Sequence, residues 1–178
     1  SLGLMSCFCI AIGLFVEYGW SIKSTSIVQI FPEFAPMQIN TALCFILIGA
    51  ALLFGLFERK KIAMVFVTLC VAISGLTLIE HLSGFNLGID TLLSDPFTTT
   101  ETTSPGRMAP NTALCFVLSS VSLYLSFFVK SANYQIGGVI GTLVFGLGFT
   151  ALEQLLLAKC CSTNSVRVSV ATTLTDAC

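Results

Sequence analysis

Six polar side chains recur near the ends of long apolar segments, and their types could carry chemistry. They are three glutamates, two asparagines and the single histidine: Glu17, Glu80, Glu153, Asn40, Asn111 and His81. Carboxylate, carboxamide and imidazole groups at one level of a membrane can form a polar ligand-binding pocket for a cation, a proton or a small polar molecule. A carboxylate at mid-bilayer costs roughly 2.5–3.5 kcal/mol on insertion scales, so its recurrence at equivalent positions indicates a use.

Purely structural roles explain the same residues, and we give them more weight than a ligand site. Asparagine and threonine in a first helical turn can satisfy backbone donors, and glutamates at helix ends can reach headgroup water. His81 has no second histidine to share a metal, which favours an interface position. The sequence also has no phosphate-binding loop and no nucleophile or zinc-protease motif. We therefore expect no catalytic residue, metal site, cofactor or enzymatic activity.

The segments that position these residues are repeated along the chain. Residues 37–45 (Met-Gln-Ile-Asn-Thr-Ala-Leu-Cys-Phe) and 108–116 (Met-Ala-Pro-Asn-Thr-Ala-Leu-Cys-Phe) are identical at seven of nine positions. Each copy opens a long apolar run, and repetition at such a distance means that one supersecondary unit is used at least twice. We predict repeat units over about 13–57 and 75–129, with a partial third unit over 134–158.

Five segments are long and apolar enough to cross a lipid bilayer, which takes about 20 residues. They are residues 2–20, 36–57, 62–82, 110–129 and 134–158. Charged residues make up only 10% of the chain, against about 25% in soluble domains, and mean hydropathy is +0.94. A net charge of −1 offers no basic surface for nucleic acid. The sequence predicts an all-α, polytopic integral membrane helix bundle over 1–158, with about five transmembrane helices built from repeated helix pairs and the lipid bilayer as its partner.

The loops predict which side each end faces. Residues 58–61 (Glu-Arg-Lys-Lys) form a short basic turn, and Lys130 lies in the turn after the fourth span. Basic turns stay on the cytoplasmic side, so the connection 83–109 and the six polar residues should lie outside. The tail beyond the fifth span would also be external, although it carries Lys159 and Arg167. We give the short basic turns more weight, because the charge bias acts mainly near helix ends.

The cysteines and small residues are interpreted as packing elements. Five of the eight cysteines lie in apolar runs, where a thiol acts as a small hydrophobe: Cys7, Cys9, Cys44, Cys70 and Cys115. The other three have irregular spacing that fits no metal site, although a disulfide in the tail stays open: Cys160, Cys161 and Cys178. Pairs of small residues four positions apart permit close helix contact. We give packing within one bundle more weight than contact in a homo-oligomer. The pairs are Gly137 and Gly141, Ala51 and Gly55, and Ser122 and Ser126.

Three blocks of sequence carry a resemblance to a known family: residues 35–45, 78–90 and 105–114. They resemble the N-terminal multi-span membrane sensor region of bacterial sensor histidine kinases and of signalling proteins with PAS and GGDEF domains. The resemblance covers most of residues 2–157. It implies a sensory input domain of two-component or diguanylate cyclase signalling, located in the bacterial inner membrane, whose partner is a cytoplasmic kinase or cyclase output domain.

The two ends of the chain depart from that pattern. Members of the family tend to carry a third Met-x-x-[His/Asn]-Thr-Ala-Leu helix after the fifth span, whereas residues 159–178 form an atypical Ser- and Thr-rich polar tail. We expect this tail to be disordered. Because the chain also begins at Ser1 inside an apolar stretch, we interpret it as a fragment or a frameshifted product that lacks the output domain.

Three functions follow from the sequence, in decreasing order of weight. The first is the sensory input domain, with Glu80, Asn40 and Asn111 lining an outer polar cluster. The second is a membrane anchoring and assembly module that uses the glycines of residues 137–146. The third is a small transporter or channel subunit, disfavoured because no span has an interior proline or a charge near its middle.

Overall fold

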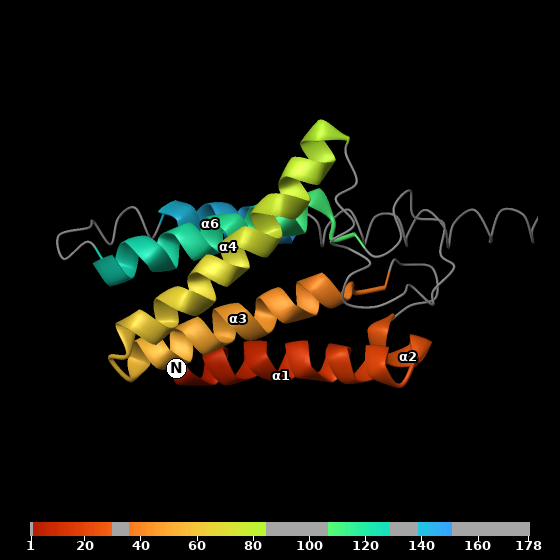
Figure 1. The fold of residues 1–178 in the computed structure, drawn as a ribbon, viewed down its shortest axis with the longest axis horizontal. Helices are drawn as coiled ribbons and strands as arrows, with labels where there is room; N and C mark the ends of the chain where they lie inside the picture. The colour runs from red at the N-terminus through yellow and green to blue at the C-terminus, as the bar shows by residue number, and fades with distance from the viewer. Residues whose placement is uncertain (1, 30–35, 85–106, 129–138, 151–178) are drawn as a thin grey trace, which may run out of the picture. The chain divides into compact units, whose positions relative to one another are not determined.

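The structure, a computed structural model, describes residues 2–29, 36–84, 107–128 and 139–150, and all regular structure in these residues is helical. The elements are α1 (Leu2–Ser21), the short α2 (Thr25–Val28), α3 (Ile39–Leu56), α4 (Lys60–Ser83) and α6 (Pro110–Phe128) (Figure 1). By contacts the chain divides into two units, Ser1–Gly141 and Thr142–Cys178, and α1 to α6 all lie in the first.

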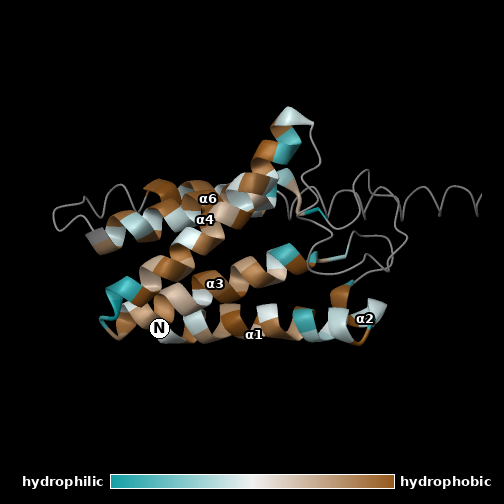
Figure 2. Ribbon diagram, viewed as in Figure 1, coloured by the Kyte–Doolittle hydropathy of each residue, from teal (hydrophilic) through white to brown (hydrophobic). Residues whose placement is uncertain are grey.

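Four of these helices, α1, α3, α4 and α6, are long and apolar enough to cross a membrane. Figure 2 shows hydrophobic residues along most of their length and hydrophilic residues gathered at the α3–α4 turn. Of the predicted fifth span, the structure describes the shorter apolar helix Val139–Thr150. The rest of that span, most of the predicted outer connection and the whole predicted tail lie outside the described residues. The prediction of an all-α chain with membrane-length helices is confirmed.

Helices α1 and α3 pack antiparallel with their backbones in close approach (Figure 1). A Cβ atom on Gly13 would lie 2.6 Å from the carbonyl oxygen of Ala42, and one on Gly49 would lie 2.9 Å from that of Ser6. Ser6 Oγ donates a hydrogen bond to the carbonyl oxygen of Gly49 at 2.6 Å. Two glycines, one from each helix, therefore allow the helices to meet at this distance, as is common in membrane bundles.

The α3–α4 connection is the basic turn that the sequence predicts. Helix α3 ends at Leu56, α4 begins at Lys60, and the intervening residues are exposed. The Arg59 amide donates to the carbonyl oxygen of Phe54 at 2.9 Å, and Glu58 adopts a left-handed conformation with φ of 57°. A chain reversal of this length requires α3 and α4 to run antiparallel.

The core lies where α3, α4 and α6 meet. Its buried members are Cys44, Leu47, Ile48, Cys70, Met108, Ala113 and Phe116. Phe45 and Phe116, which are the last residues of the two repeat copies, pack edge to face with ring centroids 5.1 Å apart. Large apolar side chains outside this core are exposed along the helices, among them Leu4, Phe8, Phe15, Val65, Leu69 and Ile79. Such a surface suits contact with lipid rather than with water.

Candidate functional site

Glu80 lies in the last turn of α4 and its side chain is fully buried. The guanidinium Nε of Arg107, just before α6, lies 3.7 Å from Glu80 Oε2, and the Arg107 side chain is only 10% exposed. A charge pair this far from water interacts more strongly than an exposed one, because the surrounding dielectric is low. The pair therefore connects the end of α4 to the start of α6.

His81, the next residue of α4, makes a second connection to the same segment. Its Nε2 lies 2.9 Å from the carbonyl oxygen of Met108, whose side chain is also fully buried. Because a carbonyl oxygen only accepts hydrogen bonds, Nε2 must carry a proton in this contact. Adjacent residues of α4 thus hold adjacent residues of the segment before α6, one by charge and one by a hydrogen bond.

A similar hydrogen bond joins α1 to the segment before α3. Trp20 Nε1 donates to the carbonyl oxygen of Met37 at 2.9 Å. Met37 and Met108 are the first residues of the two repeat copies. In both copies, an aromatic ring nitrogen from the last turn of the preceding long helix reaches the carbonyl of the repeat's first methionine. The ring type differs, but the carbonyl that accepts the hydrogen bond is equivalent.

We expect the two hydrogen bonds to contribute separately to stability. Trp20→Phe and His81→Phe each keep a ring but remove the donor, so each should lower the free energy of unfolding in detergent by about 1 kcal/mol. The double variant should lose the sum of the two. Tyr18→Phe is the matched control, since Tyr18 is an exposed aromatic residue of the same turn as Trp20. A loss for Tyr18→Phe equal to that for Trp20→Phe would contradict the assignment.

The two equivalent asparagines lie in different environments. Asn40, in the first turn of α3, is fully buried, whereas Asn111, in the first turn of α6, is exposed. Helix α3 packs against both α1 and α4, while α6 packs mainly against α4. The first turn of α3 is therefore enclosed on more sides. Buried Asn40 has two polar neighbours in sequence, Gln38 and Thr41, which are also buried.

The remaining predicted site residues are not part of this connection. Glu17 is half-buried in α1, where its backbone carbonyl accepts a hydrogen bond from Ser21 Oγ at 3.0 Å. Glu153 lies outside the described residues. Arg107 was not predicted as a site residue. Its signal in the sequence was its position as the only lysine or arginine between 62 and 129, directly before the second repeat copy.

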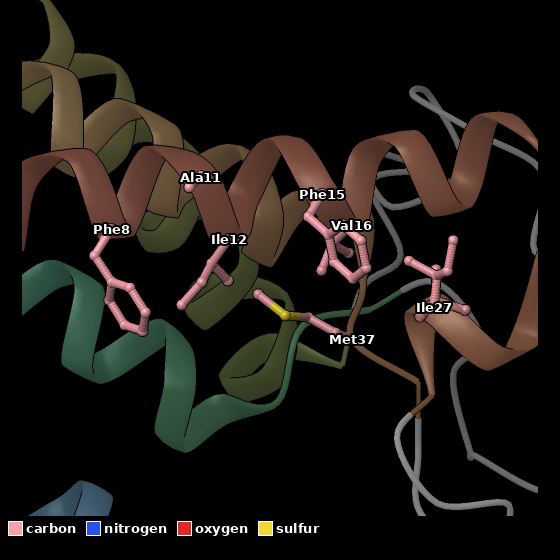
Figure 3. Close-up of a pocket in the computed structure, with 8 residues that line it drawn as sticks. Phe8, Ala11, Ile12, Phe15, Val16, Ile27 and Met37 are labelled. Carbon is pink, nitrogen blue, oxygen red and sulfur yellow. The ribbon is translucent and has the colours of Figure 1, made fainter.

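Within the described parts of the chain, no group of three or more histidine, cysteine or acidic side chains could hold a metal ion. The described residues do form an apolar groove of about 520 Å³ beside α1 and α2, lined by Phe8, Ala11, Ile12, Phe15, Val16, Ile27, Val28 and Met37. Figure 3 shows the side chains of Phe8, Ile12 and Met37 extending into the space beside α1. Every lining residue is apolar, so the groove suits contact with hydrocarbon and carries no group for polar chemistry.

These features do not place the chain in a known family. Comparison with protein-family models, with curated proteins and with solved structures finds no match. The buried connection between α4 and α6 is therefore the feature from which a function can be inferred.

Proposed function

We propose that the chain is a membrane-embedded sensory input domain of a bacterial signal-transduction protein and has no enzymatic activity of its own. The observation that carries this proposal is the connection of buried Glu80 to Arg107 and of its exposed neighbour His81 to Met108. A ligand or ion that binds the Glu80 carboxylate or the Arg107 guanidinium would compete with their ion pair. It would thereby change the contact between the two membrane-length helices α4 and α6. The site would thus convert a local chemical event into a relative movement of α4 and α6.

The length of α4 supports transmission to the other side of the membrane. At 24 residues and a rise of about 1.5 Å per residue, it is longer than the ~30 Å hydrocarbon layer. Its other end is the exposed basic turn, which the positive-inside rule places in the cytoplasm. Helix shifts of about 1–2 Å are an established means of switching. Signals from the outer end of α4 would therefore arrive at its cytoplasmic end.

The wider arrangement follows the family resemblance. In the parent protein, repeated helix pairs with about five spans would lie in the bacterial inner membrane, form a homo-oligomer through small-residue faces, and act on a cytoplasmic histidine kinase or diguanylate cyclase domain. Glu17, Asn40, Glu80, His81, Asn111 and Glu153 remain the proposed residues of the outer polar cluster. Arg107 is added to them on the basis of its ion pair with Glu80.

The proposal is tested by measuring the distance between the inner ends of α4 and α6. Spin labels on non-natural amino acids at Lys61 and Ser126, both exposed, leave the native cysteines unchanged. In nanodiscs, a panel of pH values, ions and small polar ligands should include a condition that shifts this distance by about 1–2 Å. Glu80→Gln should abolish the shift, whereas Glu58→Gln, at the exposed turn, should keep it.

Two results would count against sensing. If no condition shifts the distance, or if Glu80→Gln responds like the wild type, the buried connection does not convert a stimulus into movement. Ion flux in proteoliposomes that depends on Glu80 would instead support the transporter alternative.

A further inference from the structure

The apolar groove beside α1 is formed by three separate segments of the chain. Its lining comes from α1, from the short α2 and from Met37 (Figure 3). A Cβ atom on Gly19 would lie 2.5 Å from Ile27 Cγ2, so the missing side chain allows α2 to fold back onto α1. The Met37 amide donates to the carbonyl oxygen of Val28 at 2.8 Å, and the Met37 carbonyl oxygen accepts the hydrogen bond of Trp20. The groove is therefore built by defined backbone contacts, as pre-formed ligand sites are.

The length of the groove matches one leaflet of a bilayer. Its lining along α1 begins at Phe8, and α2 adds Ile27 and Val28 beside the last turn of α1. From Phe8 to Ser21, where α1 ends, the helix rises by about 20 Å. Half of the hydrocarbon layer is about 15 Å. The volume of about 520 Å³ lies within the range of roughly 300–1,000 Å³ for ligand sites. A lipid acyl chain fits these dimensions and the wholly apolar lining.

The groove is accessible from the surrounding lipid. Helix α1 is long and apolar enough to cross a membrane, and it packs on α3 and α2. On the side of the groove, Phe8 and Phe15 are 62% and 59% exposed, and Ala11 is exposed as well. An acyl chain can therefore enter sideways from the bilayer without any separation of the packed helices.

A cation lies where the groove reaches the polar end of α1. Lys23 is exposed, and it is the middle residue of the connection between α1 and α2. Its φ of 52° is the left-handed conformation that glycine usually supplies after a helix. Lys23 has no acidic residue within five positions in the sequence, and among the described residues it forms no ion pair. A lipid phosphate at this level of the membrane would supply the counter-charge.

We propose that this groove binds one acyl chain of an anionic phospholipid, with the lipid phosphate at Lys23. A zwitterionic phospholipid carries an ammonium group beside its phosphate, whereas an anionic one leaves the phosphate charge to the lysine. The bound lipid would hold α1 and α2 together at the membrane surface. This inference does not depend on the proposed sensory function, because neither Glu80 nor Arg107 lines the groove.

Trp20 provides the reporter for the test. It is the single tryptophan, and it packs in one cluster with the groove residues Val16 and Val28. Phospholipids with brominated acyl chains quench tryptophan fluorescence at short range. The full chain in phosphatidylcholine nanodiscs is titrated with brominated phosphatidylglycerol, which is anionic, or with brominated phosphatidylcholine. We expect half-maximal quenching at an about fivefold lower fraction of the anionic lipid, the effect of one lysine near a negative headgroup.

Two pairs of variants separate the headgroup contact from the groove. Lys23→Gly should remove the preference without harm to folding, because glycine adopts the left-handed conformation of residue 23 freely. Lys61→Gln, at the exposed α3–α4 turn, should keep the preference. Ala11→Phe places a ring in the groove and should reduce quenching by both lipids. Leu14→Phe is the matched control, since Leu14 is an exposed residue of α1 outside the lining, and it should quench like the wild type.

Three results would overturn the proposal. Equal half-maximal fractions of the two brominated lipids in the wild type would mean that the headgroup charge is not recognised. A preference that survives Lys23→Gly would remove Lys23 from the site. Unchanged quenching in Ala11→Phe would show that lipid outside the groove reaches Trp20.

Discussion

Replacing Glu80 with leucine should lower the free energy of unfolding by about 3–5 kcal/mol, because the change removes a buried counter-charge from the Arg107 guanidinium. Both side chains are almost completely shielded from solvent, with 0% and 10% exposed. Arg107→Leu should be destabilising to a similar degree. Reversible unfolding in mixed detergent micelles, followed by helical circular dichroism, measures both changes.

The double variant Glu80→Leu/Arg107→Leu distinguishes the effect of breaking the ion pair from the effect of losing side-chain packing. Replacing a whole buried ion pair with apolar side chains is often neutral or even stabilising. We therefore expect the double variant to recover most of the stability that either single variant loses. Glu58→Leu, at the exposed α3–α4 turn, should stay within about 0.5 kcal/mol of the wild type.

Additive losses of unfolding free energy in the double variant would contradict an interaction between Glu80 and Arg107. If the double variant were as unstable as the two single losses combined, Glu80 and Arg107 would act independently. The conservative variant Glu80→Gln adds a functional reading, because it keeps the side-chain size while it removes the charge. If Glu80→Gln loses little stability but no longer shows the change in distance between the inner ends of α4 and α6, then Glu80 transmits the stimulus to these helices rather than stabilising the fold.

The four long helices could be predicted closely from the length of their apolar runs. The predicted span 2–20 became α1 (Leu2–Ser21), and 110–129 became α6 (Pro110–Phe128). The prediction for α4 began two residues late, at 62 instead of Lys60. Lysines interrupt the apolar run, yet they are exposed at the start of the helix, where long side chains reach polar surroundings. The four-residue α2 is too short to produce a periodic pattern.

The site was only partly predictable. Glu80 and His81 could be identified because charged and ionisable residues are rare in apolar segments. The partner, Arg107, lies 27 residues away from Glu80 in a connection whose fold gives no sequence periodicity. Equivalence in the repeat also does not guarantee equivalent surroundings, as buried Asn40 and exposed Asn111 show. Burial of a first helical turn depends on which neighbouring helices cover it.

Helix contacts were predicted least well, since they involve two segments at once. Small residues four apart on one helix were the sequence signal for close packing, whereas the close contact between α1 and α3 uses one glycine from each helix. Among the small-residue pairs, Ala51 is buried in α3, and a methyl group placed on Gly141 would meet nothing within 4 Å. Cys44 and Cys70 were likewise interpreted as separate hydrophobes, and the approach of Cys70 Sγ to within 4.0 Å of the Cys44 carbonyl oxygen emerges only when α3 and α4 are packed together.

Alanine at Gly13 should destabilise the bundle, whereas alanine at Gly75 should stabilise it. At Gly13, the new methyl group would lie 2.5 Å from Ile46 Cγ1 and 2.6 Å from the Ala42 carbonyl oxygen. A backbone oxygen cannot rotate away, so α1 and α3 must separate, at a cost of about 1–3 kcal/mol. At Gly75 in α4, nothing lies within 4 Å of the added methyl group. Only the higher helix propensity of alanine then acts, worth about 0.5–1 kcal/mol.

Combining Gly13→Ala with Gly49→Ala distinguishes a shared contact from two local clashes. Both glycines lie on the same α1–α3 surface, where Gly49 also receives the hydrogen bond of Ser6. Once one methyl group has moved the helices apart, the second meets less resistance. The loss in the double variant, measured by the same unfolding assay, should therefore be smaller than the sum of the single losses. Strict additivity would mean that the helices do not separate as a unit, and a stabilising Gly13→Ala would refute the close approach itself.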